Sequence, residues 1–327
     1  MGCCEQTKES SASGYSWGEK TQYACGVFSA YVISFAIGGL RDVYVLMLGA
    51  NVSTMAALNA IIVTWNVINE LVISYMQDAE LLNRCMDKKI WGRRAPWMAT
   101  HIPLGFAAVV LAYCANAMNL DGNDGLYVLF FITTFTSVWT ASAQFVSFSA
   151  AQIEMFPYKE ERMEVEGITT VFALAGVMVG VLGLSLAYLD YEGGMMLPIG
   201  CVCGFLSLSS LISLGPLRKA KAPADASKLG GFFSEYCSVF KNKAFLCYCC
   251  AQFFDGCYGA SLSTFFVYYL TLQVEGGSST RSAGLALSVF ILLMGQAVMA
   301  PGGPDKVLGA ALAPIVGDWA PSPFSKR

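Results

Sequence analysis

Only a few residues of this sequence carry groups that could do chemistry, and several of them lie inside apolar stretches. Asn66 and Glu70 are four residues apart, so on a helix they share one face, and Asn69 lies beside them. A carboxyl group flanked by amides in a dry cavity can hold a proton or help to coordinate a small cation. The alternative is structural: a protonated Glu70 that is hydrogen-bonded to a neighbouring helix.

Further polar residues inside apolar stretches could line a path for a solute. Asp255 lies near the middle of the stretch at residues 244–272, where a functional and a structural role are equally compatible with the sequence. Gln144, Ser147 and Ser149 lie in the stretch at residues 126–153, which is rich in Ser and Thr. Because hydroxyl groups also join packed membrane helices, packing explains any single one of them at least as well.

The composition excludes most other chemistry. His101 is the single histidine, so neither a Ser-His-Asp relay nor a multi-histidine metal site can be assembled. Cys247, Cys249, Cys250 and Cys257 lack the spacing of a metal site, and packing is their simpler role. We therefore expect no enzyme, no bound metal and no cofactor other than a transported proton or sodium ion. A net charge of -3 makes nucleic acid an unsuitable partner.

The elements that must position these residues are long apolar helices. Of the 327 residues, 55% are hydrophobic and 13% are charged. A bilayer core of ~30 Å needs ~20 apolar helical residues to cross it. Eight stretches are long enough, at residues 22–48, 55–76, 96–117, 126–153, 168–189, 195–214, 244–272 and 283–300. The sequence therefore predicts an all-α, multi-pass membrane protein whose main partner is the lipid bilayer.

The connections between these stretches predict the orientation. Basic residues are concentrated in two connections, at residues 77–95 and 215–243, whereas the connections at 49–54, 118–125 and 190–194 carry none. Since cytoplasmic connections are enriched in Lys and Arg, we expect the N-terminus and both basic connections to lie in the cytoplasm. Within the stretches, Gly176 with Gly180 and Gly200 with Gly204 have the small-xxx-small spacing of close helix packing.

Three segments carry a more specific pattern. Asp78 precedes Gly-Arg-Arg-Ala-Pro-Trp at residues 92–97, and Glu154 precedes Pro157 and Glu-Glu-Arg at 160–162. Trp65 and Asn66, followed by Glu70, lie on the second stretch. In order and placement these segments resemble the glycoside–pentoside–hexuronide:cation symporters of the major facilitator superfamily.

The resemblance implies a helical bundle of the major facilitator type. We expect about eight membrane helices, a complete six-helix N-terminal half and part of a second half, because members of the family have twelve helices. The implied division is a cytoplasmic tail at residues 1–20, the six-helix bundle at 21–214, a cytoplasmic linker at 215–243, and a partial second bundle at 244–327.

The resemblance also implies roles for individual residues. The family's cation motif, Trp-Asp-x-x-x-Asp-Pro, falls on Trp65, Asn66 and Glu70, but Asn66 replaces one acid, so a single carboxylate remains and protons are favoured. Phe145 and Thr169 replace charged residues of the sugar-binding members, which argues against a sugar. An ion-pair gate on the cytoplasmic side would comprise Asp78, Arg93, Arg94, Glu154 and Arg162; ordinary interfacial charge is the alternative.

The sequence therefore predicts a secondary active transporter. It would move a small solute or amphiphile across a membrane, coupled to a proton or cation through Glu70. The alternative is a truncated, non-transporting membrane protein, such as a pseudotransporter or a subunit that binds a partner. A chain with about eight helices would borrow cavity walls from a homo- or hetero-oligomeric partner.

Overall fold

Six helical segments are long and apolar enough to cross a membrane in the part of the chain that the structure describes. This computed structural model describes residues 14–120, 122–189, 194–220, 241–243, 246, 247 and 250, and every regular element in these residues is helical. All of them belong to one compact unit, Met1–Gly259. The segments are Trp17–Leu46, Val52–Asp78, Ala95–Ala112, Gly125–Met155, Lys159–Ala187 and Met196–Leu217.

These segments confirm the prediction of an all-helical, multi-pass membrane protein and coincide with the first six apolar stretches. The stretches at residues 244–272 and 283–300, with Asp255, lie outside the described residues apart from 246, 247 and 250. The helices are α1 Trp17–Gly38, α2 Leu40–Leu46, α3 Val52–Asp78, α4 Lys88–Trp91, α5 Ala95–Ala112, α6 Gly125–Met155, α7 Lys159–Leu189, α8 Met196–Ser207 and α9 Ser210–Leu217, with a 3-10 turn at Leu81–Arg84.

Local sequence explains where the first helices begin. Ser16 caps α1, because its hydroxyl oxygen accepts a hydrogen bond from the backbone N–H of Glu19 while the Glu19 carboxylate accepts one from the backbone N–H of Ser16. Asn51 caps α3 by accepting from the backbone N–H groups of Ser53 and Thr54. Both caps satisfy N–H groups that the first turn of a helix leaves free.

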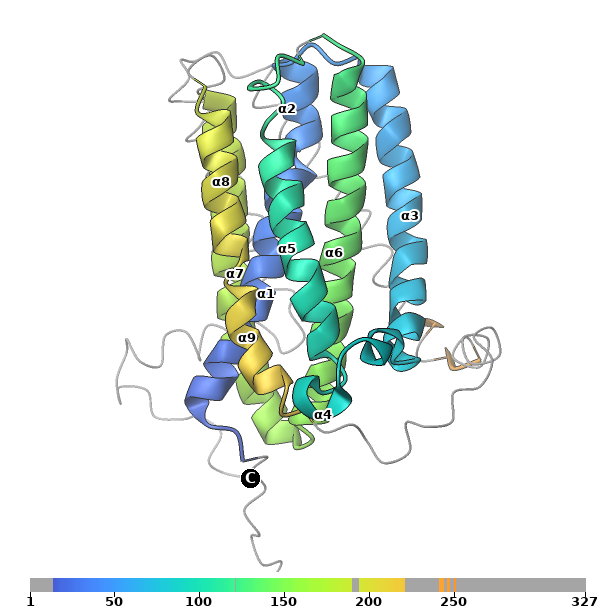
Figure 1. Cartoon of the computed structure of the whole chain (residues 1–327), viewed down its shortest axis with the longest axis vertical. Helices are drawn as coiled ribbons and strands as arrows, with labels where there is room; N and C mark the ends of the chain where they lie inside the picture. Colours follow the sequence, from blue (N-terminus) through green and yellow to red (C-terminus); the bar gives the residue numbers. More distant parts are fainter. Residues whose placement is uncertain are drawn as a thin grey trace, which may run out of the picture. The chain divides into compact units, whose positions relative to one another are not determined.

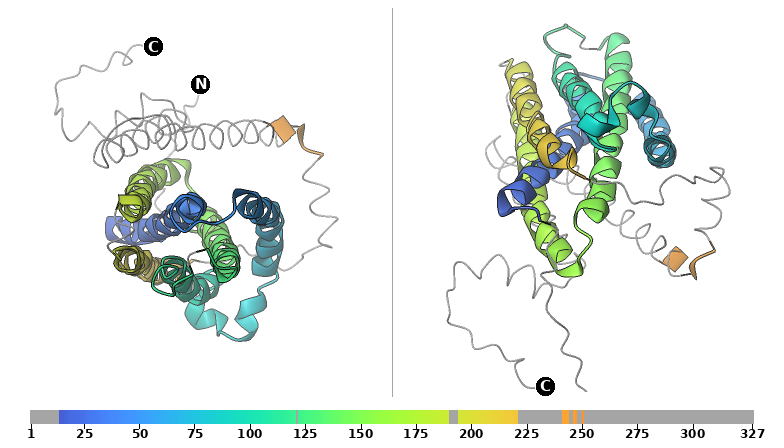
Figure 2. Two further views of the ribbon diagram at one scale, coloured as in Figure 1. Left: turned by 90° about the horizontal axis from the view of Figure 1, so that it is seen from above. Right: turned by 60° about the horizontal axis from the view of Figure 1, so that its bottom comes forward.

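The six segments alternate in direction and form two layers (Figure 1). Contacts place α7, α1, α6 and α3 in a row, each helix packed on the next, and α3 and α7 lie at the two flanks of this row (Figure 2). The second layer contains α5 and the pair α8 and α9, which pack on one another and on α1 and α6. The row therefore has one face against the second layer and one face directed away from it.

The contacts between segments have an internal symmetry. The first three segments can be paired with the last three: α1 with α6, α3 with α7, and α5 with α8 and α9. When each helix is exchanged with its pair, the α1–α7 contact corresponds to the α6–α3 contact. The same exchange maps the α5–α6 contact onto the contact of α1 with α8 and α9. The α1–α6 and α5–α8 contacts map onto themselves. The α1–α5 and α7–α8 contacts have no counterpart of similar size, so this symmetry is partial. Segments three apart run in opposite directions, as they do in an inverted repeat.

Glycines allow the closest of these contacts, as their spacing predicts. A Cβ atom at Gly180 would lie 2.8 Å from Cβ of Phe35 on α1, and one at Gly176 would collide with the carbonyl oxygen of Phe28. On α8, a Cβ atom at Gly204 would lie 2.8 Å from a methyl group of Val110 on α5. These distances are too short for a side chain, so both small-xxx-small pairs are confirmed as packing sites.

Candidate functional site: a polar pocket and an ion-pair cluster

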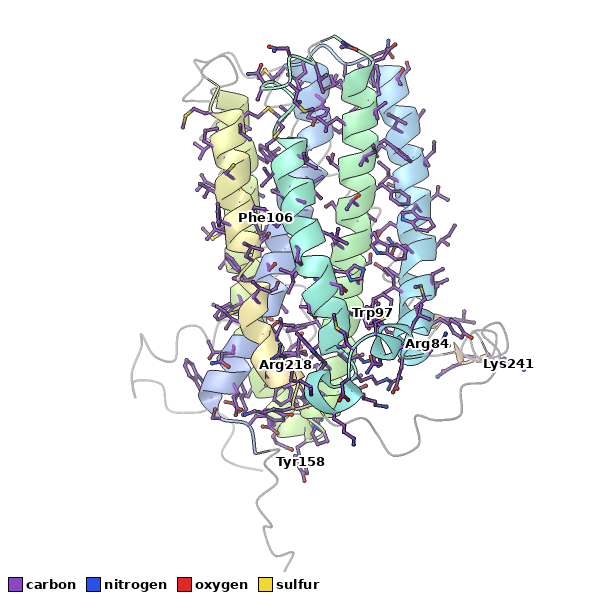
Figure 3. The ribbon with its side chains drawn as sticks, in the orientation of Figure 1. Arg84, Trp97, Phe106, Tyr158, Arg218 and Lys241 are labelled. Carbon is purple, nitrogen blue, oxygen red and sulfur yellow. The ribbon has the colours of Figure 1, made fainter. Side chains whose placement is uncertain are left out.

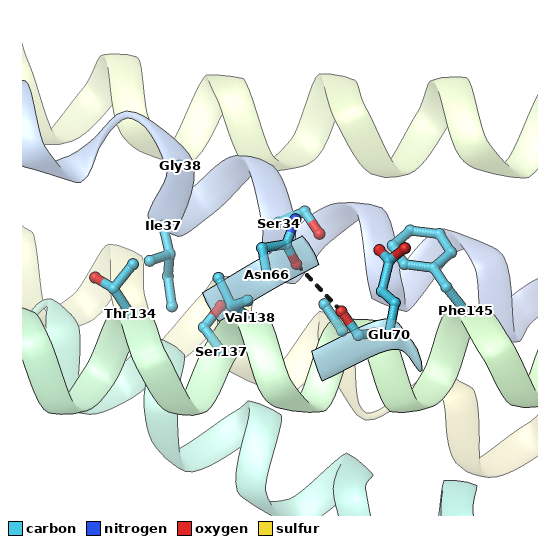
Figure 4. Close-up of a pocket in the computed structure, with 11 residues that line it drawn as sticks. Ser34, Ile37, Gly38, Asn66, Glu70, Thr134, Ser137, Val138 and Phe145 are labelled. Carbon is cyan, nitrogen blue, oxygen red and sulfur yellow. Dashed lines mark hydrogen bonds between the residues drawn. The ribbon is translucent and has the colours of Figure 1, made fainter. Parts of the chain in front are cut away.

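A pocket of about 240 Å³ lies among α1, α3 and α6 of the row (Figure 4). No residue of the second layer lines it, and α6 supplies its floor over some three turns. The lining residues are Ser34, Ile37 and Gly38 of α1, Asn66 and Glu70 of α3, and Thr134, Ser137, Val138, Ala141, Ser142 and Phe145 of α6. The pocket therefore joins two predicted site residues with a set of hydroxyl groups.

Asn66 and Glu70 share one face of α3, as their spacing predicts, and both side chains project into the pocket (Figure 4). The side-chain oxygen of Asn66 accepts a hydrogen bond from the Ser142 hydroxyl at 3.3 Å. Both residues are exposed in the described unit. A charged side chain against hydrocarbon costs about 2.5–3.5 kcal/mol, so an ionised Glu70 requires water, protein or a ligand at the open side of this pocket.

Thr134 marks the opposite end of the pocket from Glu70 and Phe145 (Figure 4). Only 8% of this residue is exposed, and its hydroxyl has no hydrogen-bond partner within the described part of the chain. A buried hydroxyl without a hydrogen-bond partner is destabilising, and this hydroxyl lies where a ligand in the pocket can reach it. The pocket also holds no Lys, Arg or His among its lining residues.

Asn69 does not lie in this pocket. It is fully buried on the face of α3 that packs on α6, and neither polar atom of its amide has a partner among the described residues. One turn earlier, Trp65 stacks on Phe135 and Trp139 of α6, with ring centroids 4.9 and 5.9 Å apart. These contacts fix the rotation of α3 that directs Asn66 and Glu70 into the pocket.

His101 supports this aromatic stack from α5. Its Nε2 atom accepts a hydrogen bond of 3.0 Å from the indole N–H of Trp139, and its Nδ1 atom lies 2.8 Å from the carbonyl oxygen of Trp97. An acceptor role for Nε2 places the ring proton on Nδ1, which then donates to Trp97. The single histidine is therefore a neutral structural link between α5 and α6.

The other predicted path residues lie elsewhere. Gln144 is buried and accepts a hydrogen bond from Ser210 of α9, so it faces the second layer. Ser147 is fully buried and donates to the carbonyl oxygen of Ala143 in its own helix. Ser149 is exposed, and none of the three lines the pocket. Asp255 lies outside the described residues.

Four of the five predicted gate residues meet at the end of the bundle that carries α4. One carboxylate oxygen of Asp78 lies 2.8 Å from Arg93 and 2.9 Å from Arg94, and one of Glu154 lies 3.4 and 3.1 Å from the same two guanidinium groups. Asp78 ends α3, Arg93 and Arg94 directly precede α5, and Glu154 is the next-to-last residue of α6. The cluster therefore ties three membrane segments together within one unit.

Most of this ion-pair cluster is buried. The side chains of Glu154, Arg93 and Arg94 are only 6–7% exposed. Gln77 extends the cluster into the core, because its oxygen accepts from Arg94 and its N–H donates to the carbonyl oxygen of Ala143. Removing one partner of a buried pair leaves the other charge uncompensated, which costs about 3–5 kcal/mol.

Arg162, the fifth predicted gate residue, makes different contacts. Its guanidinium donates to the carbonyl oxygens of Phe156 and Pro157, and it thereby closes the turn between α6 and α7. It has the role of a carbonyl cap rather than that of an ion-pair partner of Asp78 or Glu154.

The α4 end also holds contacts that the sequence did not predict. Lys20 of α1 pairs with Glu161 at 3.3 Å and with Glu164 at 2.8 Å on α7. The Arg218 guanidinium lies 3.9 Å above the ring of Trp91, and Arg84 and Arg218 lie at the same end of the bundle (Figure 3). Burial, together with nearby acidic groups on Glu19 and Glu161, raises the pKa of Tyr15.

Sequence reasoning missed the contribution of α1 to the pocket. Ser34 and Gly38 are four residues apart on one face, but small residues at this spacing usually indicate helix packing. Only the approach of α1 and α3 to the same side of α6 makes them part of a polar site.

Comparison with protein-family models, curated proteins and solved structures yields no match.

Proposed function

We propose that this protein is a secondary membrane transporter, and that Glu70 binds the proton or cation that moves during transport. The observation that carries the proposal is the pocket itself. Within a membrane-spanning segment, Glu70 and Asn66 face a cavity of about 240 Å³ lined by hydroxyl groups, with no basic residue among the lining residues to neutralise the acid. An intramembrane acid in a polar cavity is the usual mark of an ion or solute path.

The arrangement of the six segments supports a bundle of the major facilitator type. Inverted repeats of three helices are nested in each half of such transporters, and the larger contacts among the six segments have that symmetry. On this proposal the described unit is an N-terminal half, and the pocket lies on the face of the row that is directed away from the second layer. The resemblance to the glycoside–pentoside–hexuronide:cation symporters leads to the same assignment.

The ion-pair cluster at the α4 end would serve as a gate element. It joins the ends of α3, α5 and α6, so any rocking of one of these segments must stretch pairs of 2.8–3.4 Å. Breaking and re-forming such pairs gives a bundle two discrete states rather than a continuous deformation.

Transport can be tested with the purified chain in proteoliposomes that contain a pH-sensitive dye. A pool of small polar metabolites added outside should move protons in the native chain and not in Glu70→Gln, which keeps the size of the side chain and removes its charge. Glu166→Gln is the matched control, because Glu166 is an exposed acid on α7 that bonds Gln152 outside the pocket; it should behave as the native chain does.

Two results would decide against this proposal. No solute or proton movement by the native chain under any imposed gradient would favour the alternative, a membrane protein that binds a partner and transports nothing. Equal movement in the native chain and in Glu70→Gln would remove Glu70 from the transport mechanism.

A further inference from the structure

The charge of the pocket restricts the solutes that it can hold. Glu70 is the single ionisable residue among the eleven lining residues. An anionic solute would meet a like charge there, with no Lys, Arg or His of the lining to compensate for it. When Glu70 is ionised, the pocket therefore selects against carboxylates and phosphates and in favour of cations.

The pocket has hydrogen-bond acceptors at its acidic end and hydroxyl groups, which can donate or accept, along its wall. The Glu70 carboxylate can accept from several donors, and the Thr134 hydroxyl is buried without a partner among the described residues. Ser34 and Ser137 add hydroxyl oxygens along the wall. An ionised Glu70 only accepts hydrogen bonds, so the Glu70 end of the pocket matches a ligand with N–H donors, such as a protonated amine.

The shape and size of the pocket exceed those of a bare inorganic ion. A volume of about 240 Å³ corresponds to roughly eight water molecules at ~30 Å³ each. Apolar groups of Ile37, Val138, Ala141 and Phe145 interrupt the polar wall. No group of three or more His, Cys, Asp or Glu that could hold a metal ion occurs among the described residues. The wall is therefore suited to an ion with an apolar body.

We propose that the pocket binds a small organic ammonium ion. Its positive end pairs with Glu70 beside the ring of Phe145, where an aromatic face adds a cation–π attraction. Its apolar body lies along Val138 and Ala141 toward Thr134 (Figure 4). This inference rests on the proposed transport function for its physiological meaning, but the binding chemistry can be tested separately.

The proposal has a consequence for coupling. A proton and an ammonium group bind the Glu70 carboxylate in turn, because its single negative charge is balanced by one or the other. Entry of the amine therefore releases a proton from a protonated Glu70, and the two cations exchange rather than travel together. An amine added on one side should drive protons the opposite way.

Binding is measured first, with the full chain in lipid nanodiscs and thermal unfolding followed by tryptophan fluorescence. The probes are methylammonium, butylammonium and phenethylammonium, each compared with its matched alcohol, and phenethylammonium also with 3-phenylpropanoate. A ligand that binds only the folded protein raises the midpoint as its concentration exceeds its Kd. We expect at least one amine to raise it by about 3 °C, with saturation, and no alcohol or acid to do so.

The variants assign the effect to the pocket. Glu70→Gln should abolish the amine-dependent shift, and Thr134→Val should retain it, because the apolar body of the ligand lies at that end of the pocket. Glu166→Gln should retain it, because that carboxylate is exposed on α7 outside the pocket. Partition of the amines into lipid is the same for all variants, so the difference between Glu70→Gln and Glu166→Gln reports the pocket alone.

Flux is measured second, with the same probes in proteoliposomes. An alcohol that shifts the midpoint as much as its amine, failure of all three amines, or an undiminished shift in Glu70→Gln would overturn the ammonium proposal. Amine binding without any flux would instead defeat the transport function and leave the binding site. Flux of neutral solutes with no amine binding would keep transport and reject the ammonium ligand.

Discussion

Individual side chains in the pocket affect the stability of the protein as well as the proposed site. Thr134 is the clearest case, because its hydroxyl is buried in the pocket wall without a partner among the described residues. A buried, unsatisfied hydroxyl typically costs about 1–3 kcal/mol. The Thr134 hydroxyl therefore lowers the stability of the folded protein by this amount unless a ligand bonds it.

Thr134→Val removes this hydroxyl without changing the shape of the side chain. The free energy of unfolding should rise by about 1 kcal/mol, since the unsatisfied group disappears. The measurement is thermal or denaturant unfolding in a fixed detergent. Thr140→Val is the matched control, because the buried Thr140 hydroxyl donates to the carbonyl oxygen of Ser137 at 3.0 Å; there the free energy should fall. A loss in Thr134→Val would show that its hydroxyl is bonded.

The hydrogen bond between His101 and Trp139 should contribute to the stability of the protein. Each of His101→Leu and Trp139→Phe should lower the free energy of unfolding by about 1 kcal/mol or more, and the double variant should cost less than the sum. The coupling follows because either change removes the same 3.0 Å bond. Additive effects would contradict a direct link. Tyr23→Phe, which removes a buried bond from Tyr23 to the carbonyl oxygen of Phe148, should be additive with both.

At the scale of helices, close packing and buried ion pairs hold the row together. In the α1–α7 contact, α1 approaches the backbone of α7 closely at Gly176 and Gly180, which have no side chains. The α3, α5 and α6 ends are joined instead by charges, at Asp78, Arg93, Arg94 and Glu154. The two kinds of contact predict different responses to substitution.

Gly176→Ala should destabilise the protein, although alanine favours a helix. The new methyl group would meet the Phe28 carbonyl oxygen on α1, and a collision with backbone cannot be relieved by rotating a side chain. A loss of about 1–3 kcal/mol is expected from unfolding measurements. Gly167→Ala on the same helix meets nothing within 4 Å and should gain up to about 1 kcal/mol from helix propensity. Equal effects at the two glycines would contradict the α1–α7 contact.

Glu154→Gln should cost about 3–5 kcal/mol, because it leaves two buried guanidinium groups with fewer counter-charges. Asp78→Asn should cost less, since its side chain is 42% exposed and water can replace part of the interaction. Unfolding of both variants under one condition gives the comparison. A larger loss in Asp78→Asn would mean that Glu154 is not the buried centre of the cluster.

For the molecule as a whole, the distribution of charge predicts one orientation in the membrane. Cys85 is exposed at the α4 end, among the basic residues that the sequence assigns to the cytoplasm. In intact cells a membrane-impermeant maleimide should leave it unmodified, and permeabilisation should expose it. Mass spectrometry distinguishes Cys85 from the other cysteines. Modification in intact cells would reverse the predicted topology.

The sequence by itself determined the class of the molecule. Long apolar stretches and sparse charge were enough to predict the six membrane segments of the described residues, because crossing a bilayer imposes a length and a composition on each helix alone. Spacing along one helix was also enough to place Asn66 and Glu70 on one face, and Gly176 with Gly180 at a packing contact. These properties depend on neighbours in the chain, which the sequence contains.

Only the tertiary structure decided which polar residues meet. Gln144 and Ser142 are two residues apart on α6, yet one faces the second layer and the other the pocket, because helices α5 and α3 pack on different sides of α6. Asn69 is adjacent to Glu70 in the chain but is buried away from the pocket, and Arg162 caps a turn instead of joining the ion-pair cluster. Contacts between distant segments depend on how each helix is rotated, and the apolar periodicity of membrane helices specifies that rotation weakly, since both lipid and protein accept apolar side chains.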